Sequence, residues 1–313
     1  MEKLDLLKEQ QRFLKELELK GKSFNTLKNY RTDLNIFNQF LASKNRPLFL
    51  KEISAEQVKD YSRFLEQKYN SPNSIRRRIQ ALRIFFDWLM EKGLYGDNPI
   101  KKALVSPKVV DPPRPLPFKV AYALFKRLED QIENSKGLNK LIAMRNKLVF
   151  YLIYGSGLKV SDIEILQASS VFEGSPMRVM VAPPKRDPYT IPLPEGFALF
   201  YQVYQSALKA QKEKDQIEFP QLLFNANPYK ILKGGLSARG IEVIFKELSK
   251  NFEVPVTAKN LRQSCVFKWL NQQRLDSQIK EWMGVQPVYS LKPYKDLIEE
   301  DPAKHAFQEI DEN

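Results

Sequence analysis

Hydrophobic residues recur at steps of three and four through the N-terminal part of the chain, which is the period of a helix that buries one face. Between Ser23 and Ala42 this stripe consists of Leu27, Tyr30, Leu34, Phe37 and Leu41. It predicts a helix over residues 23–42, with Ser23 as its N-cap. Similar stripes predict two further helices, over residues 55–69 and 74–92.

A proline-rich stretch separates this helical region from the rest of the chain. Residues 105–117 hold five prolines, which do not fit a helix interior and predict an extended linker. We therefore expect an N-terminal domain over residues 1–104 and a second domain over residues 118–313. A chain of 313 residues is long enough for two domains that each bury a core.

The second region has mostly helical patterning with one predicted hairpin. Two short strands are expected over residues 177–182 and 189–193, around a proline-rich turn. Helices are expected over residues 118–133, 139–154, 237–251, 261–273 and 278–283. The predicted fold class is therefore mainly α, with two domains and a small β-hairpin in the second.

The charge distribution favours an anionic partner. The whole chain carries a net charge of +13. Residues 295–313 carry a net charge of −5, so the rest of the chain carries +18. A basic body with an acidic tail is typical of a protein that binds nucleic acid.

Composition argues against several other classes of protein. The single cysteine, Cys265, has no partner for an internal disulfide, and together with the single histidine, His305, it is too few for a closed zinc site. No apolar run is long enough to span a membrane, and the charged start of the chain does not resemble a signal peptide. We expect a cytoplasmic protein without metal or cofactor.

One block near the C-terminus carries a specific resemblance. Lys259-Asn260-Leu261-Arg262-Gln263-Ser264 is followed by Met283-Gly284, and Tyr294 comes ten residues after that glycine. This order resembles the active-site block of the tyrosine recombinases, the family of phage integrases and Xer-like enzymes. Thr26, Tyr30 and Ser74 also resemble features of the SAM-like core-binding domain of that family.

The resemblance implies a fold, a substrate and a reaction. The family's two domains form a C-shaped clamp that closes around double-stranded DNA. A tyrosine attacks a backbone phosphorus and forms a 3′-phosphotyrosine, so the reaction needs no metal and no external energy. Cationic donors have to stabilise the phosphate oxygens, and an acid has to protonate the departing 5′ oxygen.

Tyr294 matches the family's nucleophile, and Arg262 matches its second arginine. The family's first arginine lies in a segment that reads Gly157-Leu158-Lys159 in this chain. Lys159 keeps the charge but loses the planar fork that grips two oxygens, and a solvated surface charge is the alternative interpretation. Lys259 stands where the family usually has a histidine.

Two further positions are less regular. The family's hairpin lysine, its usual general acid, corresponds to Lys185, with Arg186 as a substitute or as a DNA contact. Val285 follows Met283-Gly284, where a histidine or tryptophan normally donates to the phosphate. Valine has no donor and is interpreted as a packing residue. Because one preorganised donor is worth about 10²–10³ in rate, these departures predict impaired cleavage.

Basic residues of the N-terminal domain are the candidate DNA contacts. They are Lys28, Arg31, Arg76, Arg77 and Arg83. The resemblance also implies that residues 295–313 dock on a neighbouring subunit, through Leu297, Ile298, Phe307 and Ile310. We therefore expect a homo- or hetero-oligomer of recombinase subunits on DNA.

Three functional hypotheses remain open at this stage. The first is a site-specific recombinase or integrase that cleaves DNA through Tyr294. The second is a degenerate family member that binds DNA or a recombinase partner without cutting. The third is a helical scaffold unrelated to DNA, which leaves the +18 body and the Arg262-to-Tyr294 spacing unexplained.

Overall fold

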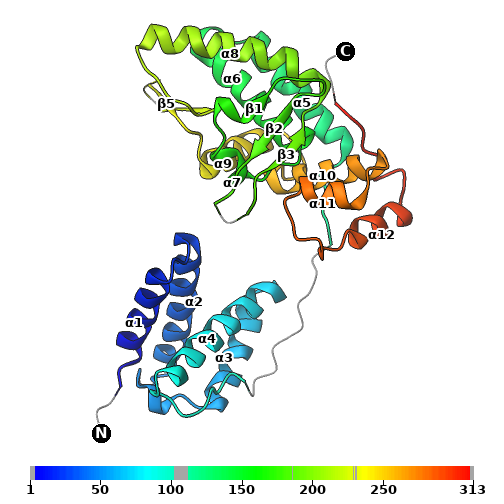
Figure 1. Ribbon diagram of the computed structural model, residues 1–313. Helices are drawn as coiled ribbons and strands as arrows, with labels where there is room; N and C mark the ends of the chain where they lie inside the picture. The colour runs from blue at the N-terminus through cyan, green and yellow to red at the C-terminus, as the bar shows by residue number, and fades with distance from the viewer. Residues whose placement is uncertain (1–3, 102–111, 185, 228, 230, 311–313) are drawn as a thin grey trace. The chain divides into compact units, whose positions relative to one another are not determined.

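The computed structural model describes residues 4–101, 112–184, 186–227, 229 and 231–310. The chain divides into two compact units, Met1–Asp111 and Pro112–Asn313, which are described separately below (Figure 1). The predicted linker of residues 105–117 lies partly outside the described residues. Its described end belongs to the second unit, because Leu116 is fully buried there and its N–H donates to the carbonyl of Asn260.

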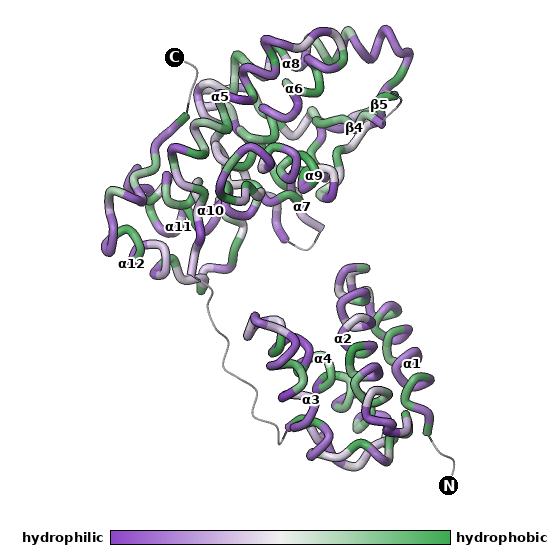
Figure 2. Tube along the Cα trace, turned by 180° about the vertical axis from the view of Figure 1, so that it is seen from behind, coloured by the Kyte–Doolittle hydropathy of each residue, from purple (hydrophilic) through white to green (hydrophobic). Residues whose placement is uncertain are grey.

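The described residues of the first unit form a bundle of four helices. They are α1 (Leu6–Leu19), α2 (Phe24–Ser43), α3 (Ala55–Lys68) and α4 (Pro72–Glu91), with a short 3₁₀ turn at Leu50–Glu52. Figure 2 shows hydrophobic and hydrophilic residues alternating along α1 and α2, as expected for helices that bury one face. The core is rich in aromatic rings, among them Phe13, Phe37, Tyr61 and Phe85.

The three helices predicted in this unit are confirmed, and α1 is an addition. Ser23 caps α2 by accepting a hydrogen bond from the Thr26 N–H, as the sequence predicted. Asp5 caps α1 in the same way, with bonds from the N–H groups of Leu7 and Lys8. Local capping chemistry therefore sets where both helices begin.

The second unit is mostly helical. Its helices are α5 (Phe118–Glu133), α6 (Gly137–Phe150), α7 (Val160–Glu164), α8 (Glu195–Asp215), α9 (Ala238–Ser249), α10 (Ala258–Asn271), α11 (Asp276–Trp282) and α12 (Lys292–Glu300). A π-helical turn over Tyr151–Gly155 continues α6, and a 3₁₀ turn spans Ala168–Ser170. The long helix α8 and the short helices α7 and α12 were not predicted from the sequence. Among the described residues, we find no helix with the length and apolar character needed to cross a membrane.

The strands form two small antiparallel sheets. The first has the order β1 (Val171–Phe172), β2 (Arg178–Val181) and β3 (Tyr189–Pro192). The pairing of Val179 with Ile191 fixes its register and buries both side chains. The hairpin of β2 and β3 confirms the predicted one. The second sheet pairs β4 (Phe224–Ala226) with β5 (Leu232–Gly234) and was not predicted.

The packing of the second unit's core positions the elements that carry the candidate site residues. The π-helical turn is buried and packs against α10, so the chain that follows it reaches the start of α7 beside α10. At the other end of the same region, α11 packs against β3. The turn before α7 and the end of α11 are thereby brought next to α10, and the β2–β3 turn reaches the end of α11.

The C-terminal segment after α12 packs on the second unit of its own chain. Phe307 and Ile310 are buried in that unit's core. The buried Lys268 ammonium donates to Glu309 Oε1 at 2.7 Å and to the Gly155 carbonyl at 2.9 Å. The predicted docking on a neighbouring subunit therefore differs from what the single chain shows, because its own core already accepts two of the four predicted anchors.

We expect Glu309→Gln to lower the free energy of unfolding by about 1–3 kcal/mol, because the substitution leaves the Lys268 cation buried without a counter-charge. Chemical denaturation monitored by circular dichroism measures the change. The matched control is Glu247→Gln, which breaks an exposed ion pair with Lys250. Exposed pairs contribute about 0–1 kcal/mol. Equal losses in the two variants would show that Glu309 does not fasten the segment.

Candidate active site

Lys159 owes its position to a tight turn at the end of the π-helical turn. Gly157 adopts a left-handed conformation with φ of +62°, and a Cβ atom there would lie 2.4 Å from Trp269 Cη2. Glycine therefore lets the backbone pass against the tryptophan ring and turn into α7. Lys159 is the residue just before α7, and its side chain is half-buried.

Arg262 lies in the first turns of α10, which begins at Thr257 with a capping box to Asn260. Its Nε donates to the Gly157 carbonyl at 2.6 Å, and its Nη2 donates to the Met283 carbonyl at 2.7 Å. The guanidinium thus ties the turn before α7 to the end of α11. Its position is fixed before any substrate binds.

The carbonyl of Gly284 accepts hydrogen bonds from two more cations. Lys159 Nζ donates to it at 3.1 Å, and Arg186 Nη1, from the β2–β3 turn, also donates to it. Burial lowers the pKa of Lys159, and the neighbouring charges of Arg262 and Arg186 lower it further. Three cations therefore converge on backbone carbonyls at the end of α11, where an anion would relieve their mutual repulsion.

Two side chains behind this cluster were missed by the sequence analysis. Asp162, buried in α7, accepts a hydrogen bond from the Tyr189 hydroxyl at 3.3 Å. Burial and the Asp162 charge raise the pKa of Tyr189 to about 12. The Arg186 guanidinium lies 5.5 Å from the centre of the Tyr189 ring. Tyr189 thus links the hairpin cation to α7.

Tyr294 lies near this cluster but is withdrawn from solvent. Its side chain is 5% exposed, and its ring packs against Phe267 with centroids 5.3 Å apart. Its hydroxyl lies close to the side chains of Tyr289 and Gln263. Burial raises the pKa of Tyr294, as does Tyr289, whereas the charge of Arg262 lowers it. The phenol is therefore neutral and held in place in this state of the chain.

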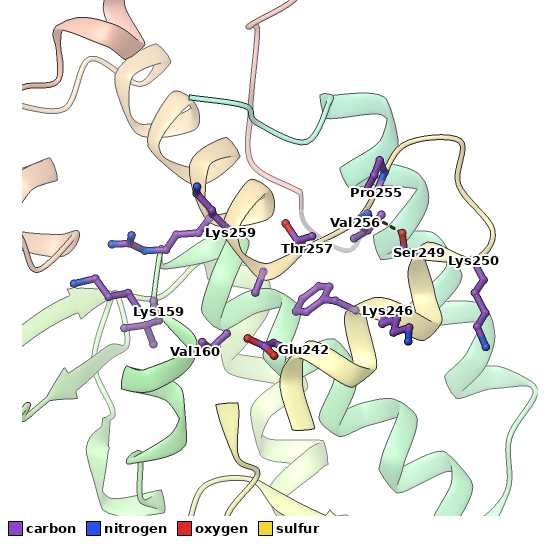
Figure 3. Close-up of a pocket in the computed structure, with 14 residues that line it drawn as sticks. Lys159, Val160, Glu242, Lys246, Ser249, Lys250, Pro255, Val256, Thr257 and Lys259 are labelled. Carbon is purple, nitrogen blue, oxygen red and sulfur yellow. Dashed lines mark hydrogen bonds between the residues drawn. The ribbon is translucent and has the colours of Figure 1, made fainter. Parts of the chain in front are cut away.

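A pocket of about 680 Å³ opens beside the cations. Lys159, Arg262 and the exposed Lys259 line it, together with Lys246 of α9 and Lys250 just after that helix. Figure 3 shows Lys159 and Lys259 on one side of the pocket, with Lys246 and Lys250 on the other. The structure therefore brings three of the predicted catalytic residues to one wall. Tyr294 does not line this pocket.

Two predicted positions need separate comment. Lys185, the predicted general acid, lies outside the described residues. Val285 packs against the hydrophobic core of the second unit, as its interpretation as a packing residue implied. Among the residues that the structure describes, we find no group of three or more His, Cys, Asp or Glu side chains placed to hold a metal ion.

In the first unit, a cleft of about 450 Å³ between α2 and α4 collects candidate DNA contacts. Its lining includes the two predicted arginines Arg76 and Arg77 and several side chains that can hydrogen-bond to DNA, namely Asn29, Tyr30, Asn73 and Gln80. Arg77 also pairs with the buried Asp33 at 2.9 Å. That ion pair holds the Arg77 guanidinium at the wall of the cleft.

The other predicted contacts of this unit lie apart from the cleft. Arg31 lines a different groove, on the side of α2 that faces α1. Lys28 is exposed on α2, and Arg83 is half-buried on α4 without lining the cleft. Of the five predicted contacts, the cleft lining therefore includes Arg76 and Arg77.

Comparison with known proteins finds tyrosine recombinases among the similar proteins. A family model for the phage integrase N-terminal SAM-like domain matches residues 11–93, which lie in the first unit. The tyrosine recombinase XerC of Chromobacterium violaceum is 27% identical over 169 residues, which cover 54% of this chain and 52% of that protein. The XerC of Oceanobacillus iheyensis is 24% identical over 275 residues, which cover 86% of this chain and 84% of that protein. This chain is similar to tyrosine recombinases over most of its length.

Solved structures confirm the mainly α fold of a tyrosine recombinase. A lambda integrase dimer bound to a COC′ core site has a TM-score of 0.67 at 15% identity, covering 99% of this chain and 81% of that one. The Tn1549 transposon integrase in complex with transposon right end DNA has a TM-score of 0.63 at 16% identity, covering 94% and 99%. The chain spans about half the length of several curated relatives it matches, such as the C. violaceum protein at 52%. Activity and partners are therefore a matter for proposal.

Proposed function

We propose that this protein is a site-specific DNA recombinase that binds duplex DNA and cleaves it through a 3′-phosphotyrosine at Tyr294. The observation that carries the proposal is the convergence of Lys159, Arg186 and Arg262 on carbonyls at the end of α11, beside the tyrosine of the family's motif. Such preorganised donors suit a phosphate whose charge grows during the reaction.

The chemistry divides among these residues as follows. The Tyr294 oxygen attacks phosphorus after losing its proton, and the bond to the 5′ oxygen breaks. Arg262 keeps Gly157 and Met283 on one edge of its guanidinium, so the remaining N–H groups are the ones to bind a phosphate oxygen. Lys159 and Lys259 add charge, and Lys185 is assigned to protonate the departing 5′ oxygen.

Tyr294 has to leave its resting position for this attack. Its hydroxyl lies beside Tyr289 and Gln263, and its raised pKa keeps the phenol protonated. The Tyr294 oxygen can attack a phosphate held next to Arg262 only after the hydroxyl turns toward the cations. We infer that DNA binding supplies this change.

A second candidate function rests on specific substitutions. Val285 offers no donor at the position after Gly284, and Lys159 has no planar fork. A chain with these changes could bind DNA, or join a recombinase subunit on DNA, without cutting it. In either role the partner is double-stranded DNA, the assembly is an oligomer, and a cytoplasmic location suits a DNA-bound protein.

A covalent-trapping experiment separates the two candidates. Duplexes that the protein binds are first selected from a random-sequence pool, and the selected site is then prepared with a nick near its centre. A recombinase becomes trapped on the nicked duplex, because the short cleaved fragment diffuses away. A slow band on a denaturing gel supports the recombinase. Binding without any such band supports the DNA-binding module, and absence of binding at low salt contradicts both.

The cleft between α2 and α4 gives a prediction for binding alone. We expect Arg76→Ala to weaken DNA binding and to lower the slope of log affinity against log salt by about one, as loss of a phosphate contact does. Arg31→Ala is the matched control, because Arg31 lines the groove on the α1 side. Fluorescence anisotropy at several salt concentrations measures both slopes. A larger effect of Arg31→Ala would place the DNA-binding face on the other side of α2.

A further inference from the structure

Two cations from different elements share one backbone oxygen in the second unit. Lys159 comes from the start of α7, and Arg186 comes from the β2–β3 turn. Both donate a hydrogen bond to the Gly284 carbonyl, although Arg186 and Gly284 are 98 positions apart in the chain. The ammonium of one and the guanidinium of the other are thus directed at the same point.

The surroundings of Gly284 are built to admit this approach. Gly284 has a left-handed conformation with φ of +57°, and a Cβ atom there would lie 2.7 Å from Arg186 Nη1. A side chain at this position would therefore push the guanidinium away. On its other side, Arg186 lies over the ring of Tyr189, which is held in turn by Asp162. The guanidinium is located by the backbone on one side and by an aromatic ring on the other.

A single carbonyl is a weak partner for two cations. Its oxygen carries only a partial negative charge, whereas a phosphate presents two oxygens that share a full negative charge. The third cation of the cluster, Arg262, lies close enough to lower the pKa of Lys159 as well. Asp162 is the carboxylate that raises the pKa of Lys159. One carboxylate against three cations leaves a place for one anionic ligand.

We propose that Arg186 and Lys159 act as a pair on one phosphate, with Arg186 supplying the planar fork that Lys159 lacks. The inference rests on the proposed function, since it assigns this phosphate as the one that Tyr294 attacks. Arginine binds two oxygens of a phosphate in fixed geometry, and the lysine adds a point charge beside it. The pair thereby does from two elements what a single arginine before α7 would do from one.

The pairing predicts that substitutions at positions 186 and 159 compensate each other. Loss of the fork at position 186 is repaired by a fork at position 159, because both side chains reach the same oxygen. We expect Arg186→Lys to reduce adduct formation on the nicked duplex about 10- to 100-fold. Arg186→Lys combined with Lys159→Arg should return it to within about threefold of the wild type, while Lys159→Arg alone changes it little.

The control comes from the same hairpin. Arg178, on β2, donates to the Thr190 hydroxyl at the exposed surface, and Arg178→Lys should leave adduct formation unchanged. A role of Arg186 confined to supporting the hairpin predicts that Lys159→Arg fails to rescue Arg186→Lys. That outcome, or an Arg186→Lys variant with full adduct formation, overturns the pairing.

A second measurement tests the pair without cleavage. In the Tyr294→Phe background, the salt dependence of DNA binding is compared for Arg186→Gln, Lys159→Gln and the double variant. Two cations on one phosphate predict a small change for each single variant and a slope lowered by about one for the double variant. A double variant whose slope falls by about two, as the sum of two equal single losses, overturns the pair and leaves the proposed function intact. No DNA binding by any of these proteins at low salt instead contradicts the proposed function itself.

Discussion

Replacing Tyr294 with phenylalanine is expected to abolish the covalent protein–DNA adduct and to leave DNA affinity within about twofold of the wild type. The phenyl ring keeps the packing on Phe267 but has no oxygen to attack phosphorus. Denaturing gels measure the adduct, and anisotropy measures the affinity.

Tyr289 provides the sharpest control for this prediction. Its side chain lies close enough to raise the pKa of Tyr294, so two phenols lie together at the site. Tyr289 is 37% exposed, whereas Tyr294 is buried, and exposure alone would favour Tyr289 as the nucleophile. We expect Tyr289→Phe to keep adduct formation. An adduct that survives Tyr294→Phe and disappears in Tyr289→Phe would transfer the nucleophile to Tyr289.

Local signals in the sequence were sufficient for the helices that have one clear apolar face and a capping residue. The helix α2 has both, and its predicted cap at Ser23 is confirmed. The helix α8 has an apolar face as well, formed by Phe197, Phe200, Tyr201, Tyr204 and Leu208. Leu199 and Val203 are exposed on its other side, at 67% and 54%, and they blur the pattern. Tertiary packing decides which of these apolar residues face inward.

The candidate site was predictable only where a motif names its residues. Arg262, Lys159 and Lys259 follow from the order of residues along the chain, and the structure places all three on one pocket. The contact between Arg186 and Gly284 follows from no local pattern, because it joins a hairpin turn to a helix end 98 residues later. The contacts of Tyr294 with Tyr289 and Gln263 depend in the same way on how α10 and α12 pack.

The C-terminal segment shows how a family expectation and a chain's own contacts can differ. Its apolar residues were predicted to dock on a neighbouring subunit, whereas Phe307 and Ile310 are buried in the core of their own chain. Their partner could not be predicted from composition, because an acidic tail beside a basic body fits a neighbouring subunit and its own domain equally well. The buried Lys268, which pairs with Glu309, decides the matter for the single chain.

Arg262→Lys is expected to slow adduct formation by about 10²–10³, the effect of removing one preorganised donor group from a developing charge. Lysine keeps the positive charge, so long-range attraction to DNA is retained and the loss reports on the fork itself. The substitution also leaves the carbonyl of Gly157 or of Met283 without its present donor. An unsatisfied buried carbonyl costs about 1–3 kcal/mol, so a lower melting temperature should accompany the slower reaction.

The matched control for Arg262→Lys is Arg239→Lys on α9, where the arginine is exposed and pairs with Glu242 at 3.1 Å. Both its adduct formation and its melting temperature should match those of the wild type. A variant of Arg262 that is less stable but reacts at the wild-type rate would make the guanidinium a structural tie between α10 and α11. A variant that is fully stable but unreactive would show that the Arg262 guanidinium acts on the phosphate and is not needed for stability. The two carbonyl bonds of Arg262 predict the combined result, because the edge of the guanidinium that holds the backbone also fixes the direction in which its remaining donors meet the DNA.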